Sequence, residues 1–222
     1  MVMLRGLIFD VDETLVYYEG YDHRGWYEEW VKPELRKHGI ELDYETYRKT
    51  VTGELPRSYV ERFGIDHVEF WKIVDVVNLN YRREMARLGR IKAFPDVSAI
   101  EELRKLGLKL AAVSNASREC TEFVLDISNL KGYFDAVYGK DYSNLDGVKP
   151  NPYLVEKALK ALNLKPDEAW MVGDSIHDVL AGERAGLKTV NVVRFGKVEG
   201  ADYYVSDLWE LLRLVKNLRE EI

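Results

Sequence analysis

The chain has 222 residues, of which 46% are hydrophobic and 32% charged, a composition that suits a packed globular protein and excludes a largely disordered one. The formal net charge is −6 with acidic and basic residues interleaved, which argues against nucleic acid as a partner. The single cysteine, Cys120, excludes an internal disulfide framework, and neither a membrane-spanning apolar run nor a signal-peptide hydrophobic region is visible, so we expect a cytoplasmic protein without a membrane partner.

The first predicted element is a buried strand that ends in two acids. The apolar run Leu7-Ile8-Phe9 is followed by Asp10 and Asp12. Alternate residues of a strand face the same way, so both carboxylates can reach one small volume as the chain turns. Crowded carboxylates repel each other unless a proton or a cation lies between them, and Mg²⁺ binds such oxygen ligands. A solvated acidic turn is the alternative, because two acids at this spacing are common by chance.

Residues 16–92 show helical rather than strand-like spacing of apolar residues, which predicts an inserted all-helical domain. We expect Asp43 to cap one helix and Asp66 to cap a longer one that ends at Gly89. The segment is rich in Tyr and Trp, and most of these side chains are expected in its hydrophobic core rather than in a binding groove.

From residue 93 onward, helices and short apolar strands alternate. The predicted strands cover residues 108–113, 134–138, 169–172, 187–193 and 203–205, and the predicted helices cover 97–106, 117–127, 151–162, 175–185 and 207 to the C-terminus. This alternation is typical of right-handed βαβ units. We therefore expect an α/β fold, with a Rossmann-like parallel sheet and helices on both faces formed by residues 1–15 and 93–222, and residues 16–92 inserted into it.

Polar residues collect at or near the ends of several predicted strands. They are Asp10 with Asp12, Ser114 with Asn115, Lys149, and Asp174 with Asp178. Taken singly, Ser114 and Asp174 can be helix caps and Lys149 a solvated loop charge. Taken together, they predict a site, because open α/β sheets bind ligands beyond the carboxyl ends of their strands.

These motifs resemble those of the haloacid dehalogenase-like (HAD) hydrolase superfamily, with the helical insertion in the place of that family's cap. The motifs are Asp10-Val11-Asp12-Glu13-Thr14-Leu15, Ser114-Asn115, Lys149-Pro150-Asn151-Pro152 and Gly173-Asp174-Ser175-Ile176-His177-Asp178. Relatives that cleave carbon–halogen bonds lack an acid at the position of Asp12. The resemblance therefore implies a phosphatase or phosphomutase rather than a dehalogenase.

The resemblance also implies the role of each residue. Asp10 would be the nucleophile that forms an aspartyl-phosphate, and Asp12 the general acid and base. The expected Mg²⁺ ligands are the carboxylate of Asp10, the backbone carbonyl of Asp12, Asp174, and Asp178 directly or through water. The residues expected to bind the substrate phosphate are Ser114, Asn115, Lys149 and Thr14, where Thr14 either uses its backbone N–H or supports the turn. The expected protein is a Mg²⁺-dependent phosphomonoester hydrolase for a small phosphorylated metabolite, either a monomer or a homodimer.

Other functions stay open at this point. A sugar phosphomutase and then a 2-haloacid dehalogenase are the alternatives within the family, and a non-catalytic partner protein is the alternative outside enzymes. Glu13 stands where many phosphatases of the family have Gly, and this additional carboxylate can repel an anionic substrate. The inserted segment offers candidates for the site entrance, each of which also suits an ordinary surface or hinge position: Tyr17, Tyr18, Tyr21, His23, Arg24 and Arg57.

Overall fold

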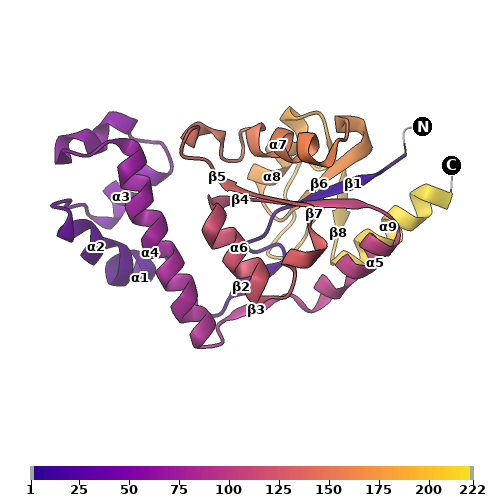
Figure 1. Cartoon of the computed structure of the whole chain (residues 1–222), viewed down its shortest axis with the longest axis horizontal. Coiled ribbons are helices and arrows are strands. Elements are labelled where there is room, and N and C mark those ends of the chain that lie inside the picture. The colour runs from indigo at the N-terminus through magenta and orange to yellow at the C-terminus, as the bar shows by residue number, and fades with distance from the viewer. Residues whose placement is uncertain (1–2, 221–222) are drawn as a thin grey trace. The chain divides into compact units, whose positions relative to one another are not determined.

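The computed structural model describes residues 3–220, and the chain divides into two compact units (Figure 1). The core unit combines the N-terminal segment up to Tyr17 with the chain from Ile91 onward, and the helical unit is Tyr18–Arg90. Strands β2 (Val16–Tyr18) and β3 (Ile91–Ala93) pair in a two-stranded sheet where the chain passes from one unit to the other. The sequence predicts only helices over residues 16–92, which is wrong at both ends of that segment.

A six-stranded sheet forms the centre of the core unit, in the order β5-β4-β1-β6-β7-β8. Its strands are β1 Gly6–Phe9, β4 Lys109–Ser117, β5 Ala136–Lys140, β6 Ala169–Gly173, β7 Lys188–Val192 and β8 Tyr203–Val205. All neighbouring strands run parallel. The predicted α/β fold with a parallel sheet is therefore confirmed.

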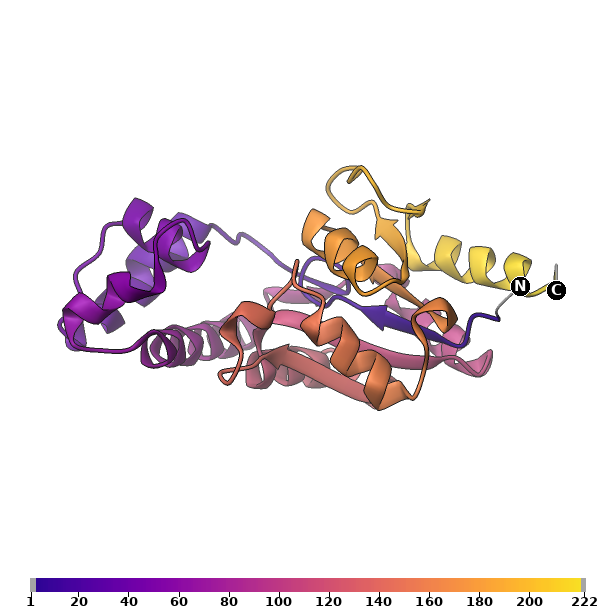
Figure 2. The same cartoon turned by 90° about the horizontal axis from the view of Figure 1, so that it is seen from above.

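Helices cover both faces of this sheet, with α7 and α8 on one face and α5, α6 and α9 on the other (Figures 1 and 2). Their bounds are α5 Ala99–Lys105, α6 Arg118–Ile127, α7 Tyr153–Leu162, α8 Ile176–Arg184 and α9 Leu208–Glu220. Short 3₁₀ turns lie in the connections between strands and helices, at Pro95–Ser98, Lys131–Tyr133, Leu145–Gly147 and Pro166–Glu168. This order of strands and helices agrees with the one predicted from hydrophobic spacing.

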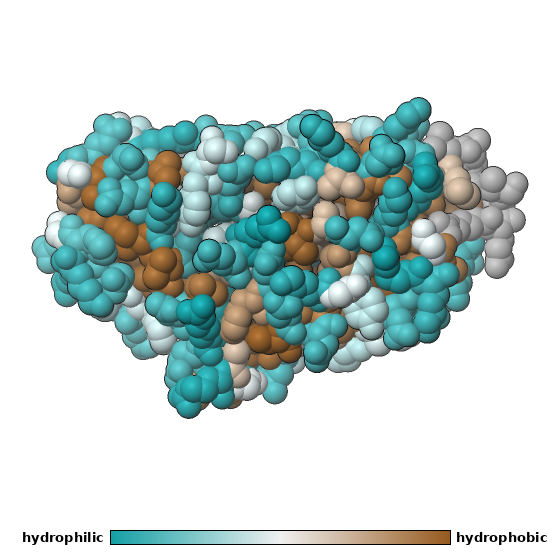
Figure 3. All heavy atoms as spheres, in the orientation of Figure 1, coloured by the Kyte–Doolittle hydropathy of each residue, from teal (hydrophilic) through white to brown (hydrophobic). Residues whose placement is uncertain are grey.

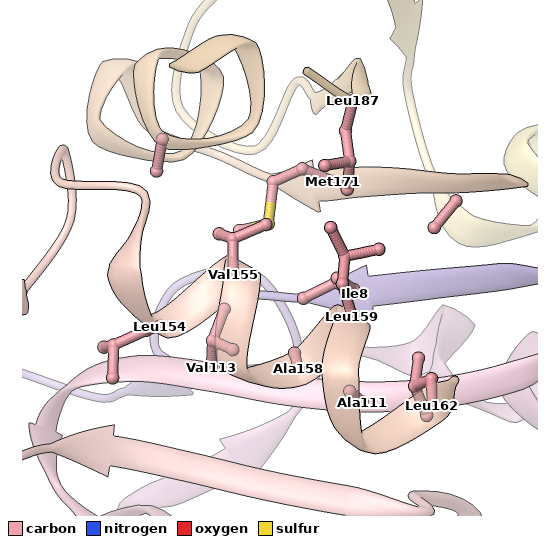
Figure 4. Packing of buried hydrophobic residues seen from close by; sticks show 12 residues of the cluster. Ile8, Ala111, Val113, Leu154, Val155, Ala158, Leu159, Leu162, Met171 and Leu187 are labelled. Atoms are coloured by element: carbon pink, nitrogen blue, oxygen red, sulfur yellow. The ribbon is translucent and has the colours of Figure 1, made fainter. Parts of the chain in front are cut away.

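The central strands are apolar along their whole length because both of their faces are covered. Every residue of β1 is buried. On the face under α7 and α8, Ile8 packs in one cluster with Val155 of α7 and Met171 of β6 (Figure 4). This packing fixes β1 in the middle of the sheet and so fixes where the chain emerges at Asp10.

Strand β4 is longer than predicted. It continues through Ser114 and Asn115 to Ser117, whereas the sequence predicts a strand that ends at residue 113. Pairing of β4 with β1 ends at Ala112, and the continuation is held by β5 through an irregular register. The strand β5 itself begins two residues later than predicted, at Ala136.

The helical unit is built from short helices around one long helix. Their bounds are α1 His23–Trp26, a π-helical turn Tyr27–Val31, α2 Lys32–Lys37, α3 Tyr44–Val51, a 3₁₀ helix Arg57–Phe63 and α4 His67–Arg87. Asp43 caps α3 by accepting from the backbone N–H of Thr46, and Asp66 caps α4 by accepting from that of Glu69. Gly89 follows α4 with a left-handed φ of 67°. These capping predictions are confirmed.

The aromatic residues of the helical unit lie largely in its core, as predicted. Tyr27 and Tyr47 are fully buried and stack with their ring centroids 4.6 Å apart. The phenol of Tyr27 donates to the carbonyl oxygen of Leu42 at 2.6 Å, which satisfies its buried hydroxyl group.

Within residues 3–220, no helix combines the length and apolar character needed to cross a membrane. Hydrophilic residues cover most of the surface visible in Figure 3, and smaller hydrophobic patches lie between them. Most of the large apolar side chains are used inside the two units.

Candidate active site

Three aspartates meet at the carboxyl edge of the sheet. Asp10 follows β1, Asp174 follows β6, and Asp178 lies in the first turn of α8. Because β1 and β6 are parallel neighbours, they end together, and the backbone N–H of Asp10 donates to the carbonyl oxygen of Val172 at 2.9 Å. One carboxylate oxygen from each of the three aspartates lies within 4.8 Å of the others. Two of the polar clusters that the sequence predicts thus converge on one small volume.

Lys149 brings a buried positive charge to these acids. Its side chain is 3% exposed, and Nζ donates to Asp10 Oδ1 at 2.5 Å and to Asp178 Oδ1 at 2.6 Å. The side chain of Asn115 holds the main chain of Lys149 from both sides: Oδ1 accepts from its N–H at 2.7 Å, and Nδ2 donates to its carbonyl oxygen at 2.8 Å. Asn115 therefore orients Lys149 instead of offering both ends of its amide to a phosphate.

Thr14 links two of the acids. Its buried Oγ1 lies 2.8 Å from Asp10 Oδ2 and 2.9 Å from Asp174 Oδ1. A hydroxyl group has one hydrogen, so it can donate to only one carboxylate at a time. The two carboxylates therefore compete for this one hydrogen. The side chain of Thr14 therefore serves the acids, and binding of the substrate phosphate by this residue stays a prediction.

The three aspartates differ in how much hydrogen-bonding capacity they have left. Asp178 is 1% exposed, and its Oδ2 accepts from the N–H of Ser175 at 3.0 Å and from the hydroxyl of Ser175 at 2.6 Å. With Oδ1 on Lys149, both oxygens of Asp178 are in use. Asp174 is only half-buried and is the most accessible acid of the three.

The charges in this cluster do not balance. Burial raises the pKa of Asp10 to about 8, although Lys149 beside it acts to lower this pKa, and the carboxylates of Asp178 and Asp174 add to the increase. Burial, followed by Asp178, also raises the pKa of Asp174. Burial alone would lower the pKa of Lys149, but Asp10 and Asp178 outweigh it and keep this pKa above its ordinary value. One ammonium group thus faces three carboxylates, and the site favours an additional proton or cation.

Asp12 and Glu13 lie on the turn that follows Asp10. The hydroxyl of Ser114, a 2% exposed residue, donates to Asp12 Oδ2 at 3.3 Å, so the second predicted cluster also reaches this site. Glu13 has a left-handed backbone with φ of 65°. Burial, followed by the nearby Asp174 and Asp12, raises the pKa of Glu13 to about 7. The left-handed conformation gives a physical reason why glycine suits this position.

Arg194, at the same edge of the sheet, is not among the residues predicted from the sequence. Arg194 lies two residues beyond β7, and its Nε and Nη2 donate to the carbonyl oxygen of Thr14 at 3.1 and 2.9 Å. The signal that could have found it is its place directly after the predicted strand 187–193, where the rule for strand ends applies as it does for the acids.

Several of the residues predicted at the site entrance make contacts inside their own units. Nδ1 of His23 lies 2.9 Å from the hydroxyl oxygen of Tyr44, and the guanidinium of Arg24 lies over the same ring. Tyr17 packs on Phe94 with ring centroids 4.9 Å apart. That these side chains contact substrate stays a prediction.

A parallel α/β sheet with acids and a buried lysine at the carboxyl ends of its strands is the arrangement of an enzyme with an acidic active site. Residues 4–186 match the haloacid dehalogenase-like hydrolase family, and the chain belongs to that family, as its motifs predict.

The relatives of this chain include enzymes named as phosphatases. The chain is 31% identical over 219 residues to phosphoglycolate phosphatase of Aquifex aeolicus, covering 96% of this chain and 98% of that one. It is 42% identical over 93 residues to pyrophosphatase PpaX of Bacillus mycoides, a match that spans 42% of each chain.

Solved structures share the fold. A HAD phosphatase from Thermococcus onnurineus is 24% identical with a TM-score of 0.65, over 96% of this chain and 98% of that chain. CbbY from Rhodobacter sphaeroides in complex with phosphate is 22% identical with a TM-score of 0.68, over 94% of this chain and 96% of that chain.

Proposed function

We propose that the chain is a Mg²⁺-dependent phosphomonoester hydrolase that acts on a small phosphorylated metabolite through an aspartyl-phosphate intermediate. The observation that carries this proposal is the meeting of Asp10, Asp174 and Asp178 around the ammonium group of Lys149. The relatives named as phosphatases support it, and so does Asp12, because a leaving alcohol needs a proton whereas a leaving halide does not.

Asp10 and Asp12 divide the reaction into two steps. In the first, a carboxylate oxygen of Asp10 attacks phosphorus, the bond to the leaving oxygen breaks, and Asp12 gives that oxygen its proton. In the second, Asp12 takes a proton from water, the water oxygen attacks phosphorus, and the bond to Asp10 breaks to release phosphate. The hydrogen bond from Ser114 to Asp12 supports this assignment, because it restrains the carboxyl group that moves the proton.

The donor set fits Mg²⁺, which prefers carboxylate and carbonyl oxygens, and the excess negative charge around Asp10 gives a reason for a cation. We infer that the ion is held by the carboxylates of Asp10 and Asp174 and by the main-chain carbonyl of Asp12. Asp178 contributes directly or through water, and its existing hydrogen bonds with Lys149 and Ser175 favour water. Bound Mg²⁺ supplies the positive charge that allows an anionic nucleophile to approach an anionic substrate.

Lys149 and Ser114 are the side chains that we propose for binding the transferring phosphoryl group, and Ser114 does so by exchanging its hydrogen bond to Asp12 for one to a phosphoryl oxygen. The Nζ of Lys149 lies beside Oδ1 of Asp10, so it can also reach the oxygens of a phosphoryl group at Asp10, where the negative charge of the transition state has to be stabilised. Thr14 contributes its main-chain N–H, since its hydroxyl group serves the acids. Asn115 acts on the phosphate by fixing the position of Lys149.

We further infer that residues 16–92 act as a cap domain on a core of residues 1–15 and 93–222, and that the cap excludes water and selects the substrate. The division of the chain after Tyr17 and after Arg90, close to these boundaries, supports the inference.

The test is a panel of phosphometabolites, including phosphoglycolate, with p-nitrophenyl phosphate as a general substrate. We expect free phosphate to appear in step with substrate loss, and we expect EDTA or Asp10→Asn to abolish it while the protein stays folded. Turnover that survives EDTA would show that the metal assignment is wrong. Isomerised sugar phosphate without free phosphate would indicate a mutase, and halide release from a haloacid a dehalogenase. No turnover above the Asp10→Asn background would favour a non-catalytic protein.

A further inference from the structure

We propose that Arg194 is a positioning residue for the proposed phosphatase, which holds the turn after β1 in the conformation that the reaction needs. The inference rests on the function proposed above for that turn. Both Nε and Nη2 of Arg194 donate to one acceptor, the carbonyl oxygen of Thr14, at 3.1 and 2.9 Å. The arginine side chain is 6% exposed, so water competes little for these hydrogen bonds.

Thr14 connects the main chain that Arg194 holds to two of the acids. Its main-chain carbonyl is held by Arg194, and its hydroxyl group lies within hydrogen-bond distance of Asp10 and Asp174. A change in the main chain at Thr14 therefore moves a side chain that bridges the nucleophile Asp10 and the proposed metal-binding acid Asp174. Arg194 lies outside residues 4–186, the part of the chain that matches the family.

Asp96 and Phe94 hold Arg194 in place. Nη2 of Arg194 lies 2.9 Å from Asp96 Oδ2, which also accepts from the N–H of Leu208 at 2.6 Å. The guanidinium lies over the ring of Phe94, 3.9 Å from its centroid. A planar guanidinium can make the two hydrogen bonds, the ion pair and the stacking contact at once, and a lysine cannot.

These contacts join the two segments that connect the core unit to the helical unit. Thr14 precedes the outgoing strand β2, and Phe94 and Asp96 follow the returning strand β3. The N–H of Phe94 also donates to the carbonyl oxygen of Leu15 at 2.9 Å. All of these residues belong to the core unit. Arg194 thus contacts both connecting segments and the turn after β1.

The experiment compares Arg194→Lys and Arg194→Met with Arg104→Met as a matched control. Arg104, in α5, also donates to a main-chain carbonyl, that of Leu108 at 3.1 Å, and pairs with an aspartate, Asp135, but its acceptor lies just before the amino end of β4, at the opposite end of that strand from the site. For both Arg194 variants we expect kcat to fall about 10- to 100-fold, the range for residues that orient catalytic or metal-binding groups, with a smaller change in KM.

Two further readouts do not depend on turnover. The Mg²⁺ concentration that gives half of the maximal rise in Tm should increase about tenfold in the Arg194 variants. Backbone hydrogen exchange in a peptide that covers residues 10–18 should be about tenfold faster, because the turn has lost its restraint. The Arg104→Met variant should change neither.

Arg194→Lys keeps a positive charge for Asp96, so it provides the test if Arg194→Met does not fold. Exchange over residues 10–18 at the wild-type rate in the lysine variant would overturn the proposal, as would a fall in Tm with kcat and the Mg²⁺ midpoint unchanged. If the wild-type protein hydrolyses no phosphomonoester, the proposed function fails, and the exchange experiment still decides whether Arg194 holds the turn.

Discussion

Gly173→Ala tests how rigidly the acidic cluster is built. Gly173 ends β6, and the carboxyl group of Asp178 lies where a β-carbon on Gly173 would be. Asp178 has no free direction in which to move, because its carboxylate is held by Ser175 on one oxygen and by Lys149 on the other. A methyl group at position 173 must therefore displace either the carboxylate or the backbone.

The expected cost is large for one methyl group. Forcing an extra carbon into a packed interior costs about 1–3 kcal/mol, and fully breaking a buried ion pair costs about 3–5 kcal/mol. A displaced Asp178 loses only part of its pair with Lys149, so we expect the free energy of unfolding to fall by about 3 kcal/mol. Urea unfolding measures this change, and the Mg²⁺ concentration for half-maximal phosphatase activity should rise in the same variant.

Gly132→Ala is the matched control, because no atom of residues 3–220 other than those of its chain neighbours lies within 4 Å of a β-carbon at that position, and its φ is not left-handed. We expect it to change the free energy of unfolding by less than about 0.5 kcal/mol. If Gly173→Ala were as stable as this control and kept its Mg²⁺ midpoint, Asp178 would have room to move, and the argument for a rigid cluster would be refuted.

The remaining predictions concern charge. Lys149→Met leaves its two buried carboxylate partners without a positive charge, so the free energy of unfolding measured in urea at pH 7 should fall by about 3–5 kcal/mol. Added Mg²⁺ should restore part of the decrease in Tm. An unchanged free energy of unfolding would show that these carboxylates are protonated. Mg²⁺ at about 100 times its dissociation constant should raise the free energy of unfolding of the wild-type protein by about 2.7 kcal/mol. The measurement is the fall in Tm when EDTA removes the ion. Asp174→Asn should abolish this fall. Hydrogen bonds from Ser143, and then an ion pair with Lys157, hold the pKa of Asp141 well below its ordinary value. Asp141 therefore stabilises the fold at pH values above its pKa in the unfolded chain, and this stabilisation is lost as the pH falls through its pKa in the folded protein. The stability difference between wild type and Asp141→Asn should therefore shrink in acid, and a difference that stays constant would contradict this account.

Local signals predicted much of the fold. The apolar strands and the helices between them follow from hydrophobic spacing, and the helix starts at Asp43 and Asp66 follow from side chains that cap the first turn. Such features depend on residues a few positions apart, so a single sequence contains the information. The parallel sheet then follows because strands joined by helices have few other ways to pair.

The strand positions that depend on distant partners could not be predicted in the same way. β2 and β3 have three residues each and exist only because they pair with one another. The continuation of β4 through Ser114 and Asn115 depends on its pairing with β5, where the register shifts between Val113 and Ser117. In both cases the deciding contact lies far away along the chain.

The candidate site shows the same division. The strand-end rule brought together Asp10, Asp174 and Lys149, which lie in one cluster. The rule did not indicate which group each polar atom contacts. Asn115, for example, binds the main chain of Lys149. This contact depends on the exact positions of two distant segments, which are set by tertiary packing.

The turn after β1 combines strain with unusually firm support. Glu13 has a left-handed backbone, which costs a residue with a side chain about 1–2 kcal/mol. Strain of this kind persists at functional sites only where the surrounding contacts outweigh it. Here the N–H of Glu13 donates to the carbonyl oxygen of Val16 at 2.7 Å, and Arg194 holds the carbonyl of Thr14 next to it. The strained Glu13 thus lies between the two acids and the carbonyl of Thr14, which accepts two hydrogen bonds from Arg194. This support is what the turn needs if it has to keep Asp10 and Asp12 directed at one phosphoryl group.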